Sequence, residues 1–267
     1  MNKRTGGAVH ARRRPIVRAR RLHMGGLAVA EREAVLERLY SVFCTYFSGH
    51  DRDTFASIAL PTAETRLALL YADDGTLAGF TSNTIQRLTI DGRVHAAMGG
   101  SGFILPAYKG GTMAGAYTLS EAARFMLRHP RVPFGFLGAL LGPTTYQRFA
   151  RSFARVYPHR RLGFPPEVAR LVREFARARN LSPEGAQPWT VNLGVRPLRT
   201  APITAERARD PDVQYFCAAN PGYVDGRALL VWIPLDAANI ASAAGALARD
   251  GFRGALGWLP GGGPARA

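Results

Sequence analysis

The amino-acid sequence predicts a protein of mixed helix and strand content (α/β, or α+β), with a mostly antiparallel central sheet flanked by helices and a C-terminal extension. Two Asp-Gly pairs, at residues 74–75 and 91–92, are typical of tight hairpin turns between neighbouring strands. Segments before and after these strands repeat apolar residues at helical spacing. The chain has 267 residues, of which 47% are hydrophobic, so it is long and apolar enough to bury a core.

The part of the chain from residue 30 to residue 158 predicts an ordered series of elements. Helical spacing of apolar residues, early acids and the stop signal Gly49 indicate a first helix. Three strands joined by the Asp-Gly turns follow, and then a helix, a short apolar strand and a strongly amphipathic helix. The expected ranges are 30–49, 66–72, 77–89, 93–105, 112–128, 134–141 and 143–158.

The extension, residues 159–267, is less regular in its pattern. We expect a helix at 165–180 with proline at its start, strands at 188–198 and 227–235, and a helix at 236–251. With residues 29–158 this extension is expected to form one domain. Residues 1–28 are expected to be a disordered basic arm, because the first 23 residues hold eight basic side chains and no acidic one.

The charge balance is strongly basic, with a formal net charge of +16. Only Lys3 and Lys109 among the 35 basic residues are lysines. This arginine bias is typical of a GC-rich genome; the alternative is a partner rich in phosphate or carboxylate groups. Two isolated cysteines indicate buried thiols in a reducing cytoplasm. No apolar run approaches the roughly 20 residues that a membrane-spanning helix needs, and we expect a cytoplasmic protein.

The segment "PAYKGGTMA", residues 106–114, leads from the last of the three strands into a helix. A helix N-terminus carries unpaired N–H groups and partial positive charge, and preceding glycines let a phosphate approach them closely. Lys109 would add a point charge for the same phosphates. Taken by itself the segment is equally compatible with an ordinary tight turn.

This segment resembles the phosphate-binding motif of the GNAT acyltransferase superfamily, through Pro106, Tyr108, Lys109, Gly110 and Ala114. Lys109 replaces the usual Gln or Arg, and Thr112 replaces the middle glycine of the motif. The hairpin "DDGTLAGF" also resembles that superfamily, and the resemblance covers about residues 30–158. It implies an enzyme that transfers an acyl group from a thioester to a primary amine, in a bacterial pathway such as natural-product biosynthesis.

The resemblance also implies where the donor binds. The donor is acyl-CoA or the phosphopantetheine arm of an acidic acyl carrier protein, held where the central strand and the next parallel strand diverge. The backbone of Phe103, Ile104 and Leu105 would pair with the pantetheine amides, and Gly135 and Gly138 would leave room for an acyl chain. The phosphates would meet the loop and first helical turn, namely Lys109, Gly110, Gly111, Thr112, Met113 and Ala114.

Catalysis of this kind needs an acid for the leaving thiolate and a base for the amine. The resemblance suggests Tyr146 as the acid, with Tyr157 as an alternative, although Tyr146 also fits the apolar stripe of its helix. His95 and Ser101 on the central strand are the candidates for the base, and a lone strand histidine also fits a structural role.

Two other readings remain open. His50, Asp51 and Asp53 are interpreted as a polar turn and helix cap, and no metal is expected. The competing function is a catalytically silent GNAT-like protein that uses an arginine-rich surface on nucleic acid or an anionic membrane. Its candidate stripe is Arg148, Arg151, Arg155, Arg160 and Arg161. The stripe lacks interleaved exposed aromatic residues and no nucleic-acid-binding signature appears, so nucleic acid is not the expected partner.

Overall fold

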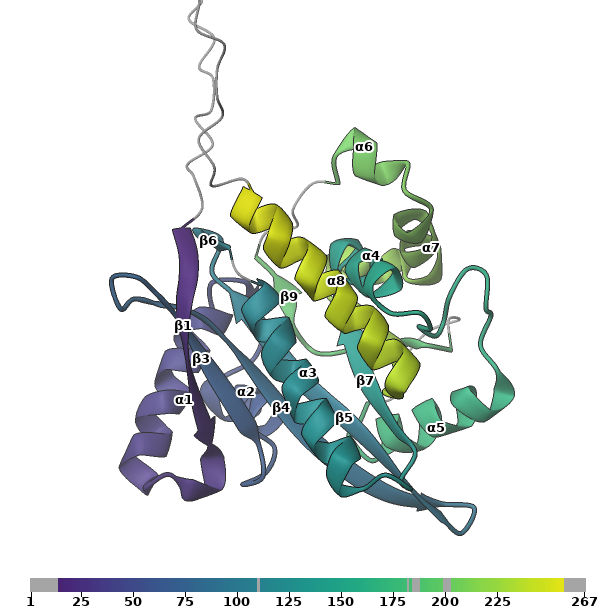
Figure 1. Ribbon diagram of the computed structural model, residues 1–267, viewed down its shortest axis with the longest axis horizontal. Coiled ribbons are helices and arrows are strands. Elements are labelled where there is room, and N and C mark those ends of the chain that lie inside the picture. The colour runs from purple at the N-terminus through teal and green to yellow at the C-terminus, as the bar shows by residue number, and fades with distance from the viewer. Residues whose placement is uncertain (1–13, 110, 182, 184–187, 199–202, 257–267) are drawn as a thin grey trace, which may run out of the picture.

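A computed structural model describes residues 14–109, 111–181, 183, 188–198 and 203–256, and the structural statements below concern these residues. The centre is an eight-stranded sheet in the order β6-β1-β3-β4-β5-β7-β10-β8, crossed by helices on both faces (Figure 1). Pairing is antiparallel except between β1 and β6 and between β5 and β7. The predicted mixed class with a mostly antiparallel central sheet is therefore confirmed.

The three predicted central strands are β3 (Arg66–Ala72), β4 (Leu77–Ile90) and β5 (Arg93–Ile104). Their turns adopt left-handed backbone angles, with φ of 80° at Gly75, 52° at Asp91 and 74° at Gly92. Glycine and aspartate tolerate these angles, which is why the Asp-Gly pairs predict hairpins here. The helix and strand expected next are α3 (Gly111–Arg128) and β7 (Phe134–Leu140).

The basic N-terminal segment is a strand from residue 14 onward, which corrects the prediction of a disordered arm over residues 1–28. Strand β1 (Arg14–His23) pairs antiparallel with β3, and short β6 (Tyr108–Lys109) pairs parallel with β1. Its arginines lie over tyrosine rings, Arg18 at 5.0 Å from the ring centre of Tyr71 and Arg21 at 5.4 Å from that of Tyr117. These cation–π contacts and the shared ladder explain why so basic a segment is ordered. Residues 1–13 lie outside the described part.

The helices divide between the two faces of the sheet. On one face α1 (Val29–Phe43) and α2 (Arg52–Ala59) pack over β3 and β4, and α5 (Pro166–Arg177) packs over β7 and β10. The opposite face is covered by α3, α4 (Pro143–Ser152), α7 (Pro211–Ala219) and α8 (Ala237–Leu256), of which α3 and α8 lie side by side in Figure 1. No helix among the described residues is long and apolar enough to cross a membrane.

The C-terminal extension completes the same sheet. Strand β10 (Arg227–Pro234) pairs antiparallel with β7 over six residues, and β8 (Thr190–Asn192) pairs with β10. The predicted 188–198 strand is broken at Gly194, where φ is 70°, and its second part, β9 (Arg196–Pro197), pairs with β2 (Phe47–Ser48). Short helical segments η1 (Met24–Gly26), α6 (Ala205–Ala208) and η2 (Pro221–Asp225) link the larger elements.

Helix α4 is shorter than the predicted range 143–158. It ends at Ser152 because Phe153 is extended, with φ −105° and ψ 142°. The chain then runs along the sheet, where Tyr157 exchanges backbone hydrogen bonds with Trp232 of β10. The pairing with β10 therefore ends the helical pattern early.

Candidate active site at the splayed strands

The two central parallel strands diverge part of the way along their length. Among the described residues, β5 and β7 pair only from Ala96–Phe134 to Met98–Phe136, while β5 continues to Ile104 and β7 to Leu140. Beyond that point β5 stays with β4 and β7 stays with β10. Gly100 and Gly102 are exposed although they lie in a central strand. The splay predicted between these two strands is therefore present.

The direction of the backbone groups follows from the alternation of strand residues. The N–H of Ala96 donates to the carbonyl oxygen of Pro133 at 2.9 Å, on the β7 side. Gly100, Gly102 and Ile104 have the same parity and direct their backbone groups toward the splay. A continued ladder would carry a hydrogen bond from Gly100 N–H to the carbonyl oxygen of Leu137, and the divergence removes it.

The carbonyl oxygen of Leu137 instead accepts a hydrogen bond from Arg179, which lies in the turn after α5. Its Nη1 donates to Leu137 O at 3.3 Å and its Nη2 donates to Ala97 O at 2.9 Å, so the guanidinium bridges the two strands where they part. Its Nε donates to Gln86 Oε1 at 3.2 Å. A Cβ on Gly99 would lie 2.1 Å from Arg179 Nη1, so glycine is needed for this approach.

Arg179 is a half-buried cation with no carboxylate partner among the described residues. Burial lowers the pKa of its guanidinium to about 10. Since that pKa is still well above neutrality, the side chain is charged at pH 7. The apex of the splay thus carries a fixed positive charge held by carbonyl oxygens.

The open end of β5 is covered by aromatic rings from the segment after α1. Phe103 packs against Phe43, Tyr46 and Phe47, with ring centres 5.8–5.9 Å away. The Tyr46 hydroxyl donates to the carbonyl oxygen of Ile104. A phenol group therefore sits directly beside the strand end that faces the splay.

Only one of the three predicted pantetheine-binding residues on β5 directs its backbone to the splay. Phe103 pairs with Phe80 of β4, and Leu105 donates its N–H to Ala78 O at 2.8 Å. The carbonyl of Leu105 accepts from Tyr108 N–H at 2.9 Å. By parity Gly100 and Gly102 join Ile104 as the candidate backbone contacts, and at Ile104 only the N–H is left because the carbonyl accepts the Tyr46 hydroxyl.

The predicted space over β7 is filled by protein atoms. A Cβ on Gly135 would lie 2.1 Å from the Trp232 ring, and one on Gly138 would lie 2.6 Å from the Phe136 ring. These glycines accommodate neighbouring aromatic side chains. The expectation that they leave room for an acyl chain is therefore wrong.

The predicted phosphate segment does not follow β5 directly, because its first part is the edge strand β6, which pairs with β1. Lys109 ends β6, and α3 begins at Gly111. Gly110 and the side chain of Lys109 lie outside the described residues. Thr112 is half-buried in the first turn, while Met113 and Ala114 pack against the sheet beside Tyr108. The roles of these residues and of Lys109 toward phosphate stay predictions.

Tyr146 lies in the core, in one cluster with Leu140 at the end of β7. It is fully buried against Phe216 and Tyr215, and its hydroxyl donates to Pro158 O at 2.9 Å. Burial raises the pKa of its phenol far above the usual value. A group so held has no contact with substrate, so the structure favours the core reading of Tyr146 over the proposed acid. Tyr157 is likewise occupied, because it packs in the core under α5.

The two candidate bases on β5 are too far apart to serve one reacting centre. His95 and Ser101 are six residues apart, which is about 20 Å along a strand. His95 stands before the paired region, and burial, followed by the nearby Arg93, lowers the pKa of its imidazole. Ser101 lies between Gly99 and Phe103 at the splay, and it bonds through its backbone to Ser82 Oγ. Of the two, only Ser101 lies at the splay, so it is the better candidate for the base.

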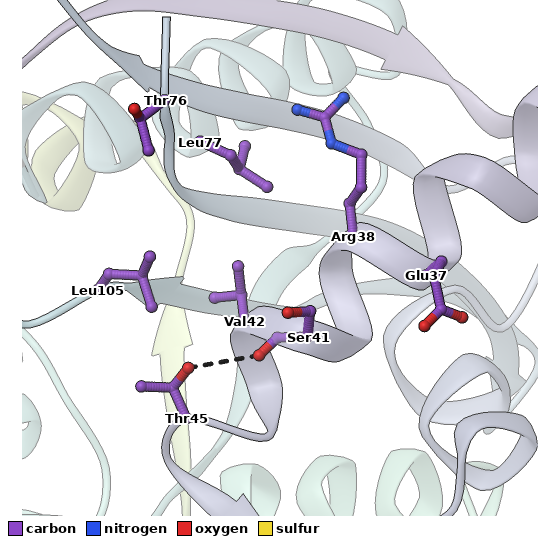
Figure 2. Close-up of a pocket in the computed structure, with 8 residues that line it drawn as sticks. All are labelled: Glu37, Arg38, Ser41, Val42, Thr45, Thr76, Leu77 and Leu105. Atoms are coloured by element: carbon purple, nitrogen blue, oxygen red, sulfur yellow. Dashed lines mark hydrogen bonds between the residues drawn. The ribbon is translucent and has the colours of Figure 1, made fainter. Parts of the chain in front are cut away.

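A groove of about 430 Å³ opens on the other side of the end of β5. Figure 2 shows Leu105, which follows β5, and Leu77 of β4 facing Val42 of α1 and Thr45, which follows α1. The Thr45 hydroxyl donates to Ser41 O at 3.3 Å, and Glu37 and Arg38 line the groove farther along α1. This groove is next to Tyr46, so it offers a second approach to the same strand end.

The arginine stripe expected for a nucleic-acid surface is largely neutralised by the C-terminal extension. Arg151 pairs with Asp210 and Arg155 with Asp236, and the Arg160 Nε lies 2.7 Å from Asp212 Oδ1. A paired guanidinium has less charge to offer a phosphate. The geometry thus weakens the competing binding-protein hypothesis.

The "HDRD" segment has the polar role predicted for it. Asp51 accepts a hydrogen bond from Thr54 N–H at 2.8 Å and caps α2, and His50 Nε2 lies 2.7 Å from Leu193 O. In the described ranges, no group of three or more His, Cys, Asp or Glu side chains is placed to hold a metal ion.

The sequence did not reveal Tyr46 or Arg179, and two of the three strand-end residues it suggested, Phe103 and Leu105, direct their backbone groups toward β4. The glycines at 99, 100 and 102 carried a usable signal, because glycine within a strand marks close approach of another group. Arg179 and Tyr46 carried none, since each reaches the splay from a distant segment.

Comparison with known proteins adds little to this geometry. No family model and no curated protein matches the chain. Among solved structures it is similar to a conserved protein of unknown function from Enterococcus faecalis V583, described as a probable N-acyltransferase, with 15% identity and a TM-score of 0.36. That match covers 52% of this chain and 33% of the other. A TM-score this low supports no inference about activity.

Proposed function

We propose that this protein is an N-acyltransferase of the GNAT type, which moves an acyl group from a CoA or acyl-carrier thioester to a primary amine. The observation that carries the proposal is the splay itself, where Gly100 and Gly102 of a central strand are exposed beyond the last residue that pairs with β7. The free edge there can pair with pantetheine amides as a strand would. The phosphate end of the tether is proposed to reach the N-terminus of α3, where unpaired N–H groups favour an anion.

The proposed reaction is direct attack of the amine nitrogen on the thioester carbonyl. A C–N bond forms and the C–S bond breaks; the amine loses a proton and the leaving thiolate gains one. Tyr46 is the proposed proton donor, because its phenol lies at the end of the splay. Ser101, also at the splay, is proposed to relay the proton from the amine through water.

Arg179 is proposed as a positioning residue. It holds Leu137 and Ala97 at the divergence, and its charge lies on the face of the sheet where Ser101 and Phe103 also point. A fixed cation near the thioester carbonyl would favour the negative oxygen of the tetrahedral intermediate.

The acceptor is proposed to enter through the groove between α1 and the end of β5. Its lining combines apolar side chains with the hydroxyl groups of Ser41, Thr45 and Thr76, which can accept hydrogen bonds from an amine. A peptide amine or a small-molecule amine fits this description equally well. The donor enters from the opposite side of β5, so the two substrates meet at the strand end.

The test is calorimetry and turnover with acetyl-CoA, a long-chain acyl-CoA and an acyl carrier protein. We expect binding of at least one donor, and amine-dependent release of its thiol with a mass gain of the acyl group on the acceptor. Gly102→Val, which places a branched side chain at the splay, should weaken donor binding about tenfold or more. Lys109→Ala should weaken it as well, through the lost phosphate contact.

The matched control is Gly75→Asn in the β3–β4 turn, where φ is 80° and an added Cβ would meet no other atom within 4 Å. It should bind the donor as the unaltered protein does. Absence of binding to all three donors would refute the proposal. Equal affinity of Gly102→Val and the unaltered protein would remove the splay from it.

A further inference from the structure

A cavity of about 240 Å³ lies on the face of the sheet that α3 covers, opposite to the face with the groove beside α1. Its buried part consists of Asn83, Met98, Glu121 and Phe125, each less than a tenth exposed. Its outer part carries arginines from the sheet and from α3. Met98 precedes the divergence of β5, so this cavity adjoins the paired part of the strand, away from the splay.

The amide nitrogen of Asn83 finds no acceptor among the residues that the structure describes. Its side chain is 3% exposed, and its Nδ2 makes no hydrogen bond. A buried amide nitrogen without an acceptor costs free energy, and buried polar groups in native proteins are nearly always paired. Since Asn83 lines the cavity, an acceptor atom of a bound molecule is the direct way to satisfy it.

The cavity carries more positive than negative charge. Glu121 is only 4% exposed and is compensated twice, by Arg124 Nη1 at 2.7 Å and Arg66 Nε at 3.4 Å. Arg87 and Arg128 also line the cavity, and among the described residues neither pairs with a carboxylate. Arg87 lies 5.2 Å from the ring centre of Phe125 and donates to His129 Nε2 at 2.9 Å.

We propose that this cavity binds a small organic acid, with a carboxylate between Arg87 and Arg128 and a second acceptor atom on Asn83 Nδ2. Met98 and Phe125 would contact the carbon chain between these two ends. A carboxylate matches guanidinium geometry well, and the apolar floor favours a carbon body over a bare inorganic ion. The proposal is independent of acyl transfer, because it uses no residue of the splay.

The probe is succinate, titrated into the full-length protein by calorimetry, with succinamide as its uncharged analogue. We expect succinate to bind and succinamide not to bind. Asn83→Asp replaces the amide nitrogen by oxygen at nearly equal size, so it should weaken succinate binding about tenfold or more. Arg87→Gln, an exposed change that the fold tolerates, should weaken it similarly and guards against misfolding of the Asn83 variant.

Arg170→Gln is the matched control, because it removes an exposed arginine that pairs with Asp91 outside the cavity. It should leave succinate affinity unchanged. The proposal is overturned if the unaltered protein does not bind succinate, if succinamide binds equally, or if Arg170→Gln weakens binding as much as Arg87→Gln. Binding of inorganic phosphate in place of succinate, with the same dependence on Asn83, would overturn the assignment to an organic acid.

Discussion

Two tyrosine hydroxyls donate to backbone carbonyls in different surroundings, and they give a matched pair of substitutions. Tyr146→Phe should lower the free energy of unfolding by about 1–2 kcal/mol, because the buried carbonyl of Pro158 loses its donor. Turnover per folded molecule should stay unchanged. Tyr46→Phe should slow turnover about 100-fold, the size expected for a lost proton donor, with a much smaller effect on unfolding.

Denaturant unfolding and steady-state rates measured on both variants test this pair. If turnover is slowed in Tyr146→Phe and unchanged in Tyr46→Phe, the proton donor is Tyr146 and the assignment to Tyr46 is wrong. Equal loss of stability in both would show that the Tyr46 contact is structural.

Gly99 and Gly102 differ in what a methyl group would meet. At Gly99 a Cβ would lie 2.1 Å from Arg179 Nη1, so Gly99→Ala must displace a guanidinium that holds two carbonyls. We expect a loss of about 1–3 kcal/mol in the free energy of unfolding. At Gly102 the nearest atom, Thr81 Oγ1, is 3.5 Å from the Cβ position, and Gly102→Ala should leave stability nearly unchanged. Thermal unfolding of the two variants provides the comparison.

At the scale of elements, β1 is tied to the β3–β4 turn by Arg14, which lies 2.7 Å from Asp73 and 2.9 Å from Asp74. The hydrogen bond from Arg14 is the main cause that lowers the pKa of Asp74 from 3.8 to about 2. A lowered carboxyl pKa stabilises the fold above pH 3.8, and this contribution is lost as the pH falls through about 2.

Arg14→Gln should therefore raise the pKa of Asp74 toward about 4, its ordinary value. Carbon-detected NMR titration of the carboxyl group measures this shift. Arg20→Gln, which removes another exposed arginine of β1, is the control and should leave the titration unchanged. An unmoved Asp74 titration in Arg14→Gln would mean that backbone donors alone account for the lowered pKa.

The elements that the sequence predicts well are those fixed by local chemistry. The Asp-Gly turns and the alternating strands between them determine β3, β4 and β5 within a residue or two. Strand β1 was missed because its order comes from pairing with β3 and from tyrosine rings elsewhere in the chain. The end of α4 was placed too late because the partner of Tyr157 lies on β10, 75 residues away.

The candidate site also has a part that local sequence reveals and a part that depends on distant segments. The glycines of β5 and the turn into α3 are contiguous, so a motif can reveal them. Tyr46 and Arg179 act on that strand from the segments after α1 and α5, and no pattern of spacing connects them to it.

At the scale of the whole molecule, the resemblance to a known superfamily ends at about residue 158, but the sheet does not. Strand β10 covers β7 with Leu229, Leu230 and Val231, each at most 1% exposed. A chain ended after residue 158 would expose to water the edge of β7 and the face that α5 covers. We expect such a fragment to aggregate or to lack a cooperative unfolding transition, as circular dichroism and NMR dispersion would show. A fragment that melts cooperatively would mean that the first 158 residues form an independent unit.

Through Arg179, the segment after residue 158 contributes to how β5 and β7 are held. Its guanidinium occupies the place that the Gly100 amide would take if β5 and β7 stayed together, so the turn after α5 sets where those strands separate. Chimaeras that exchange segments at residue 158 would have to import an equivalent cation with the new tail. Without such a cation, β5 and β7 would continue to pair, and this pairing would close the gap through which a thioester is proposed to enter.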